Sequence, residues 1–586
     1  MKKIRKRIYF TGWFIFAFIL VLIMRLSQIQ LLDTESFSKY EVNLIEESVK
    51  QRTQQVLIDD GRGQFVDRNG QPIGRKYIPT LVLFPFLKNY SWPIEKLLEI
   101  VDVPKQKIIS SLKSVKEPVL LNKETGVVIN ERMIEEINNL KIPGVFGVYM
   151  ETKPSSYQPS HLIGMTSSDK HLLQHAYPER KEFPHNAKIG VLGLEQAFDE
   201  FLQPEEETKL MYHVDGIGRP LFGVNVKYIA DANPFYPISI KTTIDLDLQQ
   251  MAEEIVDRHQ LSKGGLILLD IETNEVLALV SRPSLNRNDV KTYKNYMYET
   301  LFPGSVFKTV IAAAAIEENL IKTNQIFNCD LNLYGEYEKD LNKRHGKLNF
   351  EDSFAKSCNY TFATLSEQLM NHNENLLEEY AEKLGLTNLV GWTGQVYHYD
   401  EFKQIPVEQK GVIWEKDENK KDLNFIRQTA IGQKDVKVSP LAVANMLATI
   451  ARGGEKREVK IASSILYKNG TTMFEFEDRP LKGDTISPYT AQKLQNLLRQ
   501  VVVHEEGTGR RFQTLPFKVA GKSGTAETGR HAGEEKLYHK WFAGYFPFEQ
   551  PKYALVVVEM DKKSNESVTN AVYYDVVNAL YNIQKS

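Results

Sequence analysis

Ser305 and Lys308 lie three residues apart at the start of an almost wholly apolar run, and they are the first residues of this sequence whose types and spacing could do chemistry. The run reads LFPGSVFKTVIAAAAIEE over residues 301–318. We expect a helix buried on every side to begin near Ser305, with both side chains on one face of its first turn. Burial and the positive end of the helix dipole both disfavour a charged lysine. A neutral lysine beside a hydroxyl is a general base beside a nucleophile.

Two later segments add to this pair, because an S-x-x-K pattern alone often arises by chance. Ser357-Cys358-Asn359 follows 52 residues after Ser305, and Lys522-Ser523-Gly524-Thr525 follows 217 residues after it. S-x-x-K, S-x-N-like and K-T-G-like elements in this order are the motif set of penicillin-binding proteins and serine β-lactamases. The three motifs together indicate serine acyl transfer.

The elements that must position these motifs come from both ends of the carboxy-terminal part. Strand-like runs occupy 264–271 and 275–280, and three more occupy 517–527, 540–547 and 552–561. Mostly helical sequence lies between the two groups, and an amphipathic segment covers 571–583. This order predicts one sheet built from the two ends of this part of the chain, with helices against it.

The amino-terminal part mixes short alternating segments, helical patches and turns. Asn69-Gly70 predicts a tight hairpin between residues 65–66 and Ile73, and residues 191–202 have helical spacing. This is typical of an α+β region. Pro234 and Pro237 interrupt any helix before a strand-then-helix pattern begins, so we expect the domain boundary there.

The first 32 residues predict a membrane anchor. Residues 1–7 carry five positive charges, and residues 8–24 carry no charge, enough for a helix of about 26 Å. A cleaved signal peptide normally has a shorter apolar core and a small-residue site, which is missing after Arg25. The cations before the span orient the amino terminus toward the cytoplasm and the rest outward. The net charge of -2 does not point to nucleic acid.

Beyond the three motifs, the chain resembles a Bacillus-like monofunctional class B penicillin-binding protein, a membrane-anchored peptidoglycan D,D-transpeptidase. The similarity runs nearly end to end. Further segments in family order are Arg62-Gly63, residues 67–70 (DRNG), 193–195 (GLE), 345–346 (HG), 432–454, 507–509 (GTG) and 541–547 (WFAGYFP). Phe302 stands where Glu is common, and Ser523 stands where Thr is frequent.

The resemblance implies the organisation of the chain. It implies a multidomain protein with a cytoplasmic tail and transmembrane helix over 1–32 and an α+β pedestal or dimerisation domain over 33–232. Residues 233–586 would form an α/β transpeptidase domain with an antiparallel sheet flanked by helices. The enzyme would lie in the cell membrane as a single-pass protein, with its catalytic domain outside the cytoplasm.

The resemblance also implies roles for the motif residues. Ser305 would attack the penultimate D-Ala carbonyl of a stem peptide while Lys308 removes its proton. Ser357 would pass a proton to the departing D-Ala, and Asn359 would hold Lys308 and the substrate amide. Lys522 would lend positive charge, and Ser523, Gly524 and Thr525 would bind the substrate, with both hydroxyls on its terminal carboxylate. Backbone N–H groups of Ser305 and Thr525 would form the oxyanion hole.

The implied partners are peptidoglycan stem peptides, β-lactam antibiotics, the membrane through residues 8–24, and a glycosyltransferase or other cell-wall synthesis protein. We expect no cofactor, no metal and no nucleic acid. A β-lactam sensor acylated once, or a non-catalytic scaffold of a wall-synthesis complex, remains an alternative function. Slow turnover of a peptide or thioester substrate would separate the enzyme from both.

Other interpretations of the motifs fit less well. A class A β-lactamase needs an E-x-x-L-N segment after the S-x-N motif, but residues 338–342 precede Ser357. A P-loop containing residues 521–523 would need Gly at position 516, which is Pro516. Arg62, Asp67 and Glu195 are interpreted as inter-domain structural residues.

The two cysteines predict no disulfide framework. We interpret Cys329 and Cys358 as free, buried residues, in preference to a nucleophile or a zinc site with His345 and Asp340.

Overall fold

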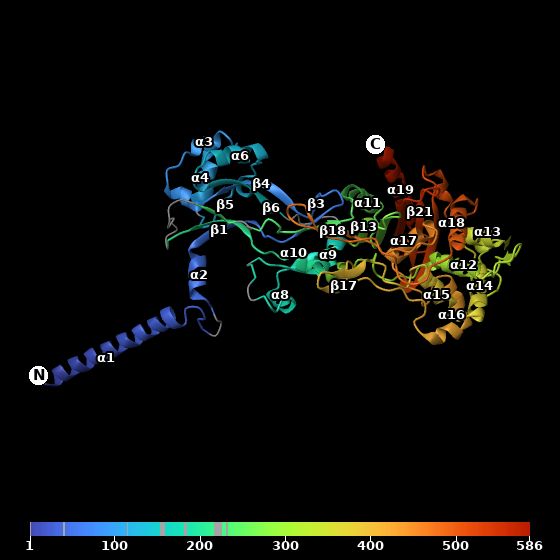
Figure 1. The fold of residues 1–586 in the computed structure, drawn as a ribbon, viewed down its shortest axis with the longest axis horizontal. Helices are drawn as coiled ribbons and strands as arrows, with labels where there is room; N and C mark the ends of the chain where they lie inside the picture. The colour runs from blue at the N-terminus through green and yellow to red at the C-terminus, as the bar shows by residue number, and fades with distance from the viewer. Residues whose placement is uncertain are drawn as a thin grey trace. The chain divides into compact units, whose positions relative to one another are not determined.

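The computed structural model describes residues 2–38, 42–113, 115–152, 159–180, 183–184, 186–215, 226–229 and 233–585. The chain divides into two compact units (Figure 1). Unit 1 comprises residues 1–61, 76–152 and 205–232, and unit 2 comprises 62–75, 153–204 and 233–586. The chain therefore passes between the units several times. The division at 33–232 and 233–586 stays a prediction, and residue 232 itself lies outside the described residues.

Unit 1 begins with α1 (Lys2–Ser27), which continues as η1 (Gln28–Leu32). The two together are long and apolar enough to cross a membrane, and none of their apolar side chains is buried in the protein. The rest of unit 1 holds two small sheets around one apolar core. Their strand orders are β1 (Thr53–Asp59), β9 (Thr208–His213), β10 (Lys227–Ile229), and β5 (Val119–Leu120), β4 (Lys76–Leu83), β6 (Val145–Thr152).

Unit 2 contains the predicted sheet from the two ends of the carboxy-terminal part. Its order is β13 (Val276–Arg282), β12 (Gly264–Asp270), β22 (Tyr553–Lys562), β21 (Glu535–Phe546), β20 (Ala520–Ala532), and every neighbouring pair is antiparallel. The prediction of an antiparallel sheet flanked by helices is therefore confirmed. The third motif lies on β20, at the edge of this sheet.

Strand β12 of this sheet is apolar on both faces, because helices cover each face. Leu266 and Leu268 of β12 pack with α11 (Leu246–Arg258) and α19 (Thr569–Lys585). Ile267 and Leu269 point to the other face, into the core that contains α12 (Lys308–Glu317) and α17 (Pro440–Ala451). Successive side chains of the strand point to opposite faces, so β12 contributes to two hydrophobic cores, one on each face of the sheet.

The apolar helix after Ser305 starts later than predicted. Residues Gly304–Phe307 form the 3-10 helix η4, and α12 begins only at Lys308. Gly304 has φ +57, and a Cβ there would lie 2.5 Å from the carbonyl oxygen of Thr525. This close approach constrains the chain entering the helix. Side chains at i and i+3 eclipse in a 3-10 turn, so Ser305 and Lys308 still share one face.

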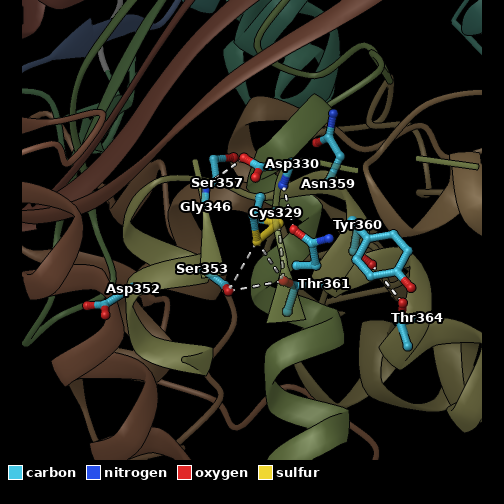
Figure 2. Close-up of a disulfide and its surroundings, with 12 residues drawn as sticks. Cys329, Asp330, Gly346, Asp352, Ser353, Ser357, Asn359, Tyr360, Thr361 and Thr364 are labelled. Atoms are coloured by element: carbon cyan, nitrogen blue, oxygen red, sulfur yellow. Dashed lines mark hydrogen bonds between the residues drawn. A yellow bond between two sulfur atoms is a disulfide. The ribbon is translucent and has the colours of Figure 1, made fainter. Parts of the chain in front are cut away.

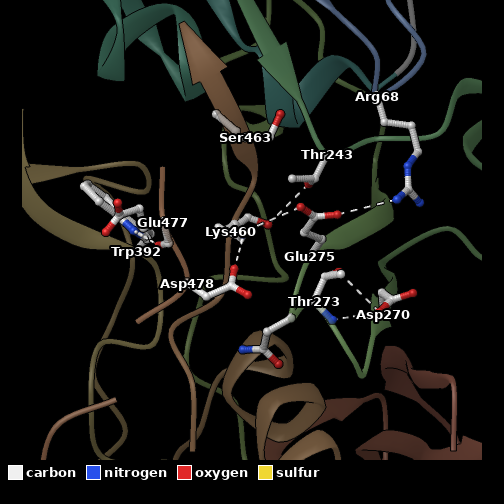
Figure 3. Close-up of polar contacts among 12 residues, drawn as sticks. Arg68, Thr243, Asp270, Thr273, Glu275, Trp392, Lys460, Ser463, Glu477 and Asp478 are labelled. Carbon is white, nitrogen blue, oxygen red and sulfur yellow. Dashed lines mark hydrogen bonds and ion pairs between the residues drawn. The ribbon is translucent and has the colours of Figure 1, made fainter. Parts of the chain in front are cut away.

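A second sheet of unit 2 has the order β19 (Thr472–Glu475), β18 (Ala462–Leu466), β11 (Ser239–Thr242), β2 (Gln64–Val66), β3 (Pro72–Ile73). The hairpin predicted at Asn69-Gly70 is confirmed, because Phe65 pairs with Ile73. Figure 3 shows an ion network at this sheet: Lys460 contacts Asp478 and lies 3.6 Å from Glu275, which also lies 3.5 Å from Arg68. The D-R-N-G segment is thereby connected to the turn before β13.

Further helices of unit 2 share one hydrophobic core with α12, and the second motif lies between the first two of them. They are α13 (Phe350–Ala355), α14 (Asn359–His372), α15 (Leu376–Lys383), α16 (Leu423–Ala430) and α18 (Pro488–Val503). Residues predicted as one helical patch at 191–202 form two short helices, α9 (Gly193–Ala197) and α10 (Asp199–Leu202). Two-stranded pairs complete unit 2: β7 (Met165–Ser167) with β8 (Ile189–Leu192), β14 (Phe327–Asn328) with β15 (Lys347–Leu348), and β16 (Thr393–Val396) with β17 (Tyr399–Lys403).

Candidate active site

Lys308 is fully buried at the start of α12, and its ammonium nitrogen reaches the second motif. Nζ donates to the carbonyl oxygen of Ser357 at 2.7 Å, to Ser357 Oγ at 3.1 Å and to Asn359 Oδ1 at 2.7 Å. All three acceptors are neutral. Burial, with a smaller contribution from the positive charge of Lys522, holds the pKa of Lys308 well below its ordinary value. The site therefore favours an uncharged amine at a fixed position.

Ser305 is half-buried on the preceding turn. Among the described residues, no hydrogen bond occupies its hydroxyl, so the oxygen is available to an incoming group. The eclipsed 3-10 geometry sets it on the same side as Lys308. Catalytic hydrogen bonds often tighten only when substrate is bound, so this geometry suits a nucleophile beside its base.

The second motif lies on a constrained turn between α13 and α14. Ser357 has φ +62, a left-handed conformation that is uncommon for a residue with a side chain and that occurs preferentially at functional sites. The N–H of Cys358 donates to the carbonyl oxygen of Ser353 at 2.8 Å and closes the turn. This backbone shape points the Ser357 carbonyl at Lys308 Nζ.

Cys358 and Cys329 form a disulfide beneath this turn, which corrects the interpretation of the cysteines as free (Figure 2). Their Cα atoms lie 5.9 Å apart although the residues are 29 positions apart in sequence. The pairing of β14 with β15 brings Cys329 under the start of α14, and sequence spacing alone does not encode this contact. Both sulfurs are buried and are not thiolates, so the zinc interpretation with His345 and Asp340 is wrong.

Lys522 brings a second buried lysine to the site from the edge strand β20. Burial lowers its pKa to about 7. Its Nζ lies 3.4 Å from the carbonyl oxygen of Ser523 and 5.7 Å from the centre of the Phe354 ring. Because Phe354 belongs to α13, the third motif packs directly against the helix that leads to the second.

The first and third motifs are in backbone contact. A Cβ at Gly524 would lie 2.5 Å from the Pro303 carbonyl oxygen, and one at Gly304 would lie 2.8 Å from the Thr525 nitrogen. The indole N–H of Trp541 donates to the carbonyl oxygen of Phe302 at 3.0 Å and ties the same turn to β21. The glycines thus allow the backbones of Ser305 and Thr525 to approach each other.

The structure places all eight predicted site residues on these three neighbouring segments. They are Ser305, Lys308, Ser357, Asn359, Lys522, Ser523, Gly524 and Thr525. The sequence prediction assigned no role here to Thr508, whose Oγ1 accepts a hydrogen bond of 2.8 Å from Ser523 Oγ. It also missed the disulfide. The GTG segment at 507–509 was visible as a family element, but nothing in its sequence indicated this contact.

Arg62 forms a structural ion network elsewhere in unit 2. Its guanidinium, 2% exposed, donates to Glu195 Oε2 and to Asp199 Oδ1, each at 2.7 Å. The two carboxylates raise its pKa despite the opposing effect of burial. Glu195 and Arg62 are therefore partners of each other within unit 2, and the inter-domain role predicted for them stays a prediction.

Carboxylate oxygens of Asp59, Asp60 and Glu151 in unit 1 lie within 4.8 Å of one another. The hydroxyl of Tyr77 donates to Asp59 Oδ2 at 2.7 Å, and the N–H of Asp60 donates to Glu151 Oε2 at 3.4 Å. These contacts are those of a hydrogen-bonded turn, and we assign no metal to them.

Residues 264–578, more than half of the chain, match the family described as Penicillin binding protein transpeptidase domain. The chain belongs to this family. The matched region spans the whole five-stranded antiparallel sheet and the three motifs.

Curated relatives are similar over most of their length. Peptidoglycan D,D-transpeptidase FtsI of Buchnera aphidicola is 25% identical over 603 residues, covering 97% of this chain and 94% of the relative. Stage V sporulation protein D of Bacillus subtilis is 24% identical, covering 94% and 81%.

A solved structure, "Structural coordination of polymerization and crosslinking by a peptidoglycan synthase complex", matches with a TM-score of 0.66 at 21% identity. It covers 98% of each chain, and at this identity the likeness concerns the fold.

Proposed function

We propose that this protein is a peptidoglycan D,D-transpeptidase that cross-links stem peptides through an acyl-enzyme on Ser305. The observation that carries the proposal is the buried Lys308, whose nitrogen is held by Ser357 and Asn359 and whose pKa is lowered. Membership of the transpeptidase family and relatives named peptidoglycan D,D-transpeptidase support the same reaction.

In the first half-reaction, Ser305 Oγ bonds to the penultimate D-Ala carbonyl carbon, and its proton passes to Lys308 Nζ. The bond to the terminal D-Ala nitrogen breaks, and Ser357 delivers the proton that this amine requires, with Lys308 as its source. Free D-Ala leaves, and the peptide remains as an ester of Ser305. In the second half-reaction, the amine nitrogen of a neighbouring stem peptide bonds to the ester carbonyl carbon, the bond to Ser305 Oγ breaks, and one proton of the amine passes through Lys308 to restore the serine hydroxyl.

The remaining motif residues would bind and polarise the substrate. Asn359 holds Lys308 and would contact the substrate amide. Lys522 supplies positive charge, and Ser523 and Thr525 would bind the terminal carboxylate beside Gly524. Backbone N–H groups of Ser305 and Thr525 would form an oxyanion hole, each donor contributing about 3 kcal/mol to transition-state stabilisation. The close approach at Gly304 and Gly524 supports that last assignment.

The apolar α1 and the family together support a membrane-anchored protein. We propose that its amino terminus is cytoplasmic and that the transpeptidase lies outside, because five cations precede the span. A glycosyltransferase is a proposed partner, since the similar solved structure is described as a synthase complex that couples polymerization with crosslinking.

β-Lactams would acylate Ser305, and this provides the test. Fluorescent penicillin should label the native protein and fail to label Ser305→Ala. Ser284→Ala, an exposed serine outside the three motifs, serves as the matched control and should label normally. Stoichiometric label on Ser305→Ala would reject the nucleophile. Release of D-Ala from a D-Ala-D-Ala peptide would then distinguish the enzyme from a sensor or scaffold.

A further inference from the structure

A cavity of about 210 Å³ lies in unit 2, beside the connection that runs from β13 to η4. Its walls come from α7 (Ser160–Ile163) and the residues after it, from the turn between β8 and α9, and from residues 285–299. Lys294 and Val407 line the cavity and are also exposed, so it opens at the surface. None of the described residues that line it belongs to the three motifs, so the cavity is separate from the candidate active site.

Two glycines allow main-chain segments to cross at one wall of this cavity. Gly164 has φ +87, and a Cβ there would lie 1.9 Å from the carbonyl oxygen of Leu192. Gly193 has φ +62, and a Cβ there would lie 2.5 Å from the carbonyl oxygen of Leu162. Backbone in direct contact cannot be rearranged by a change of rotamer. This wall is therefore formed before any ligand arrives, as in most small-molecule sites.

Two polar side chains that line the cavity are more than nine-tenths buried and carry an unpartnered polar atom. Among the described residues, Asn295 Nδ2 and the hydroxyl of Tyr298 have no hydrogen-bond partner, and the two residues are 8% and 4% exposed. Asn295 Oδ1, in contrast, accepts from the N–H of Met297 at 3.1 Å, which fixes the orientation of the amide. A buried donor without an acceptor costs free energy, so a ligand that accepts from these groups would recover it.

His161 adds an acceptor to the same cavity, and it is 7% exposed. Its Nε2 lies 2.8 Å from the carbonyl oxygen of Thr292, which only accepts, so Nε2 carries the proton and Nδ1 is an acceptor. Burial lowers the pKa of His161 against the opposing effect of that hydrogen bond, and burial raises the pKa of Tyr298 well above its ordinary value. Both groups are thus uncharged near neutral pH. Lys294 and Glu299 pair with each other at 3.1 Å, so the cavity offers a ligand no unpaired charge among these groups.

We propose that this cavity binds a small uncharged amide, whose carbonyl oxygen accepts from Asn295 and Tyr298 and whose N–H donates to His161. The proposal goes beyond the transpeptidase reaction and does not depend on it. An amide offers an acceptor and a donor side by side, as this set of groups requires. A carboxylate or an ammonium group would bring an uncompensated charge into a largely apolar cavity, and a hydrocarbon would leave the donors unpaired. The apolar part of the ligand would contact Leu192 and Leu285.

The test is binding of benzamide to the full-length protein in detergent, measured by saturation-transfer NMR. We expect a Kd on the order of 1 mM, and at least about tenfold weaker binding of benzoate, which has the same shape and a charge. Asn295→Asp keeps the oxygen that accepts from Met297 and removes the donor, so benzamide binding should weaken by about tenfold or more. Tyr298→Phe should weaken it by about fivefold. Tyr296→Phe changes a tyrosine of the same segment that does not line the cavity and should match the native protein.

The stability of Tyr298→Phe provides a second readout. This variant removes a hydroxyl without a partner among the described residues, so its thermal denaturation midpoint should equal or exceed that of the native protein. A lower midpoint would show that the hydroxyl has a structural partner and would overturn the site. Failure of benzamide to bind the native protein would also overturn it, as would equal affinities of the native protein, Asn295→Asp and Tyr298→Phe. Penicillin labelling of Ser305 tests the transpeptidase separately, so the two proposals can fail independently.

Discussion

The start of α12 and the edge strand β20 each bury a lysine at the same site, and the two surroundings differ. Lys308 Nζ donates to two carbonyl-type oxygens and one hydroxyl, whereas Lys522 Nζ has a long contact with Ser523 O and lies near the Phe354 ring. Burial lowers both pKa values, and Lys522 lowers that of Lys308 further. One residue type thus provides a positioned base in one region and a cation that titrates near neutrality in the other.

The neutral acceptors around Lys308 explain why it can be held without being charged. A carboxylate partner would favour the ammonium form, but a backbone carbonyl and an amide oxygen do so much less. The left-handed backbone at Ser357 positions its carbonyl acceptor, and Asn359 at the start of α14 supplies the amide oxygen. Among the described residues Lys522 has no such set of acceptors, and burial is the cause of its lowered pKa.

The largest effect should come from removing the base. Lys308→Met should reduce the acylation rate constant by about 10³-fold or more, because general-base catalysis contributes on the order of 10²–10⁴. Lys308→Arg keeps the cation but cannot lose a proton near neutral pH, so it should be as slow. Stopped-flow acylation by a chromogenic β-lactam measures both. Acylation of either variant at a near-native rate would remove Lys308 from the mechanism.

A change at Asn359 should test whether Lys308 needs a neutral acceptor at this position. Asn359→Asp puts a carboxylate at the amide oxygen that accepts from Lys308 Nζ at 2.7 Å, so the pKa of Lys308 should rise. At pH 7 we expect acylation to slow by about 10²-fold, with recovery as pH increases and Lys308 loses its proton. Asn359→Ala should slow acylation without that recovery. A pH–rate profile shared by both variants would contradict this explanation.

The pH dependence of kcat/KM should separate the two lysines. Lys308 must be unprotonated, so kcat/KM rises as pH passes its lowered pKa. Lys522 must be protonated to bind a carboxylate, so kcat/KM falls as pH rises above about 7. Lys522→Arg stays charged and should lose this falling limb, which amounts to about a hundredfold difference at pH 9, two pH units above the pKa of Lys522. A falling limb that persists unchanged in Lys522→Arg would assign it to another group.

The disulfide should affect stability more than rate. A cross-link that closes a loop of 29 residues stabilises by about 3–4 kcal/mol, mainly by restricting the unfolded chain. Cys329→Ala with Cys358→Ala should lower the free energy of unfolding by about that amount, measured by urea denaturation. Acylation by penicillin at 25 °C should change by only about threefold, since Ser357 retains its hydrogen bonds to Lys308. An unchanged urea midpoint would contradict the stabilising role.

The amino-acid sequence by itself determined the three motifs, the strands at 264–271, 540–547 and 552–561, and the apolar run after Ser305. These are local features: residue types at fixed spacings, with periods of two or near-helical repeats. Tertiary structure decided the rest. The 3-10 turn at Ser305 depends on the backbone of Thr525 lying against Gly304, and the disulfide depends on the pairing of β14 with β15. The partnership of Thr508 with Ser523 likewise joins α18 to β20, because contacts between distant segments follow from packing, which no local pattern in the chain encodes.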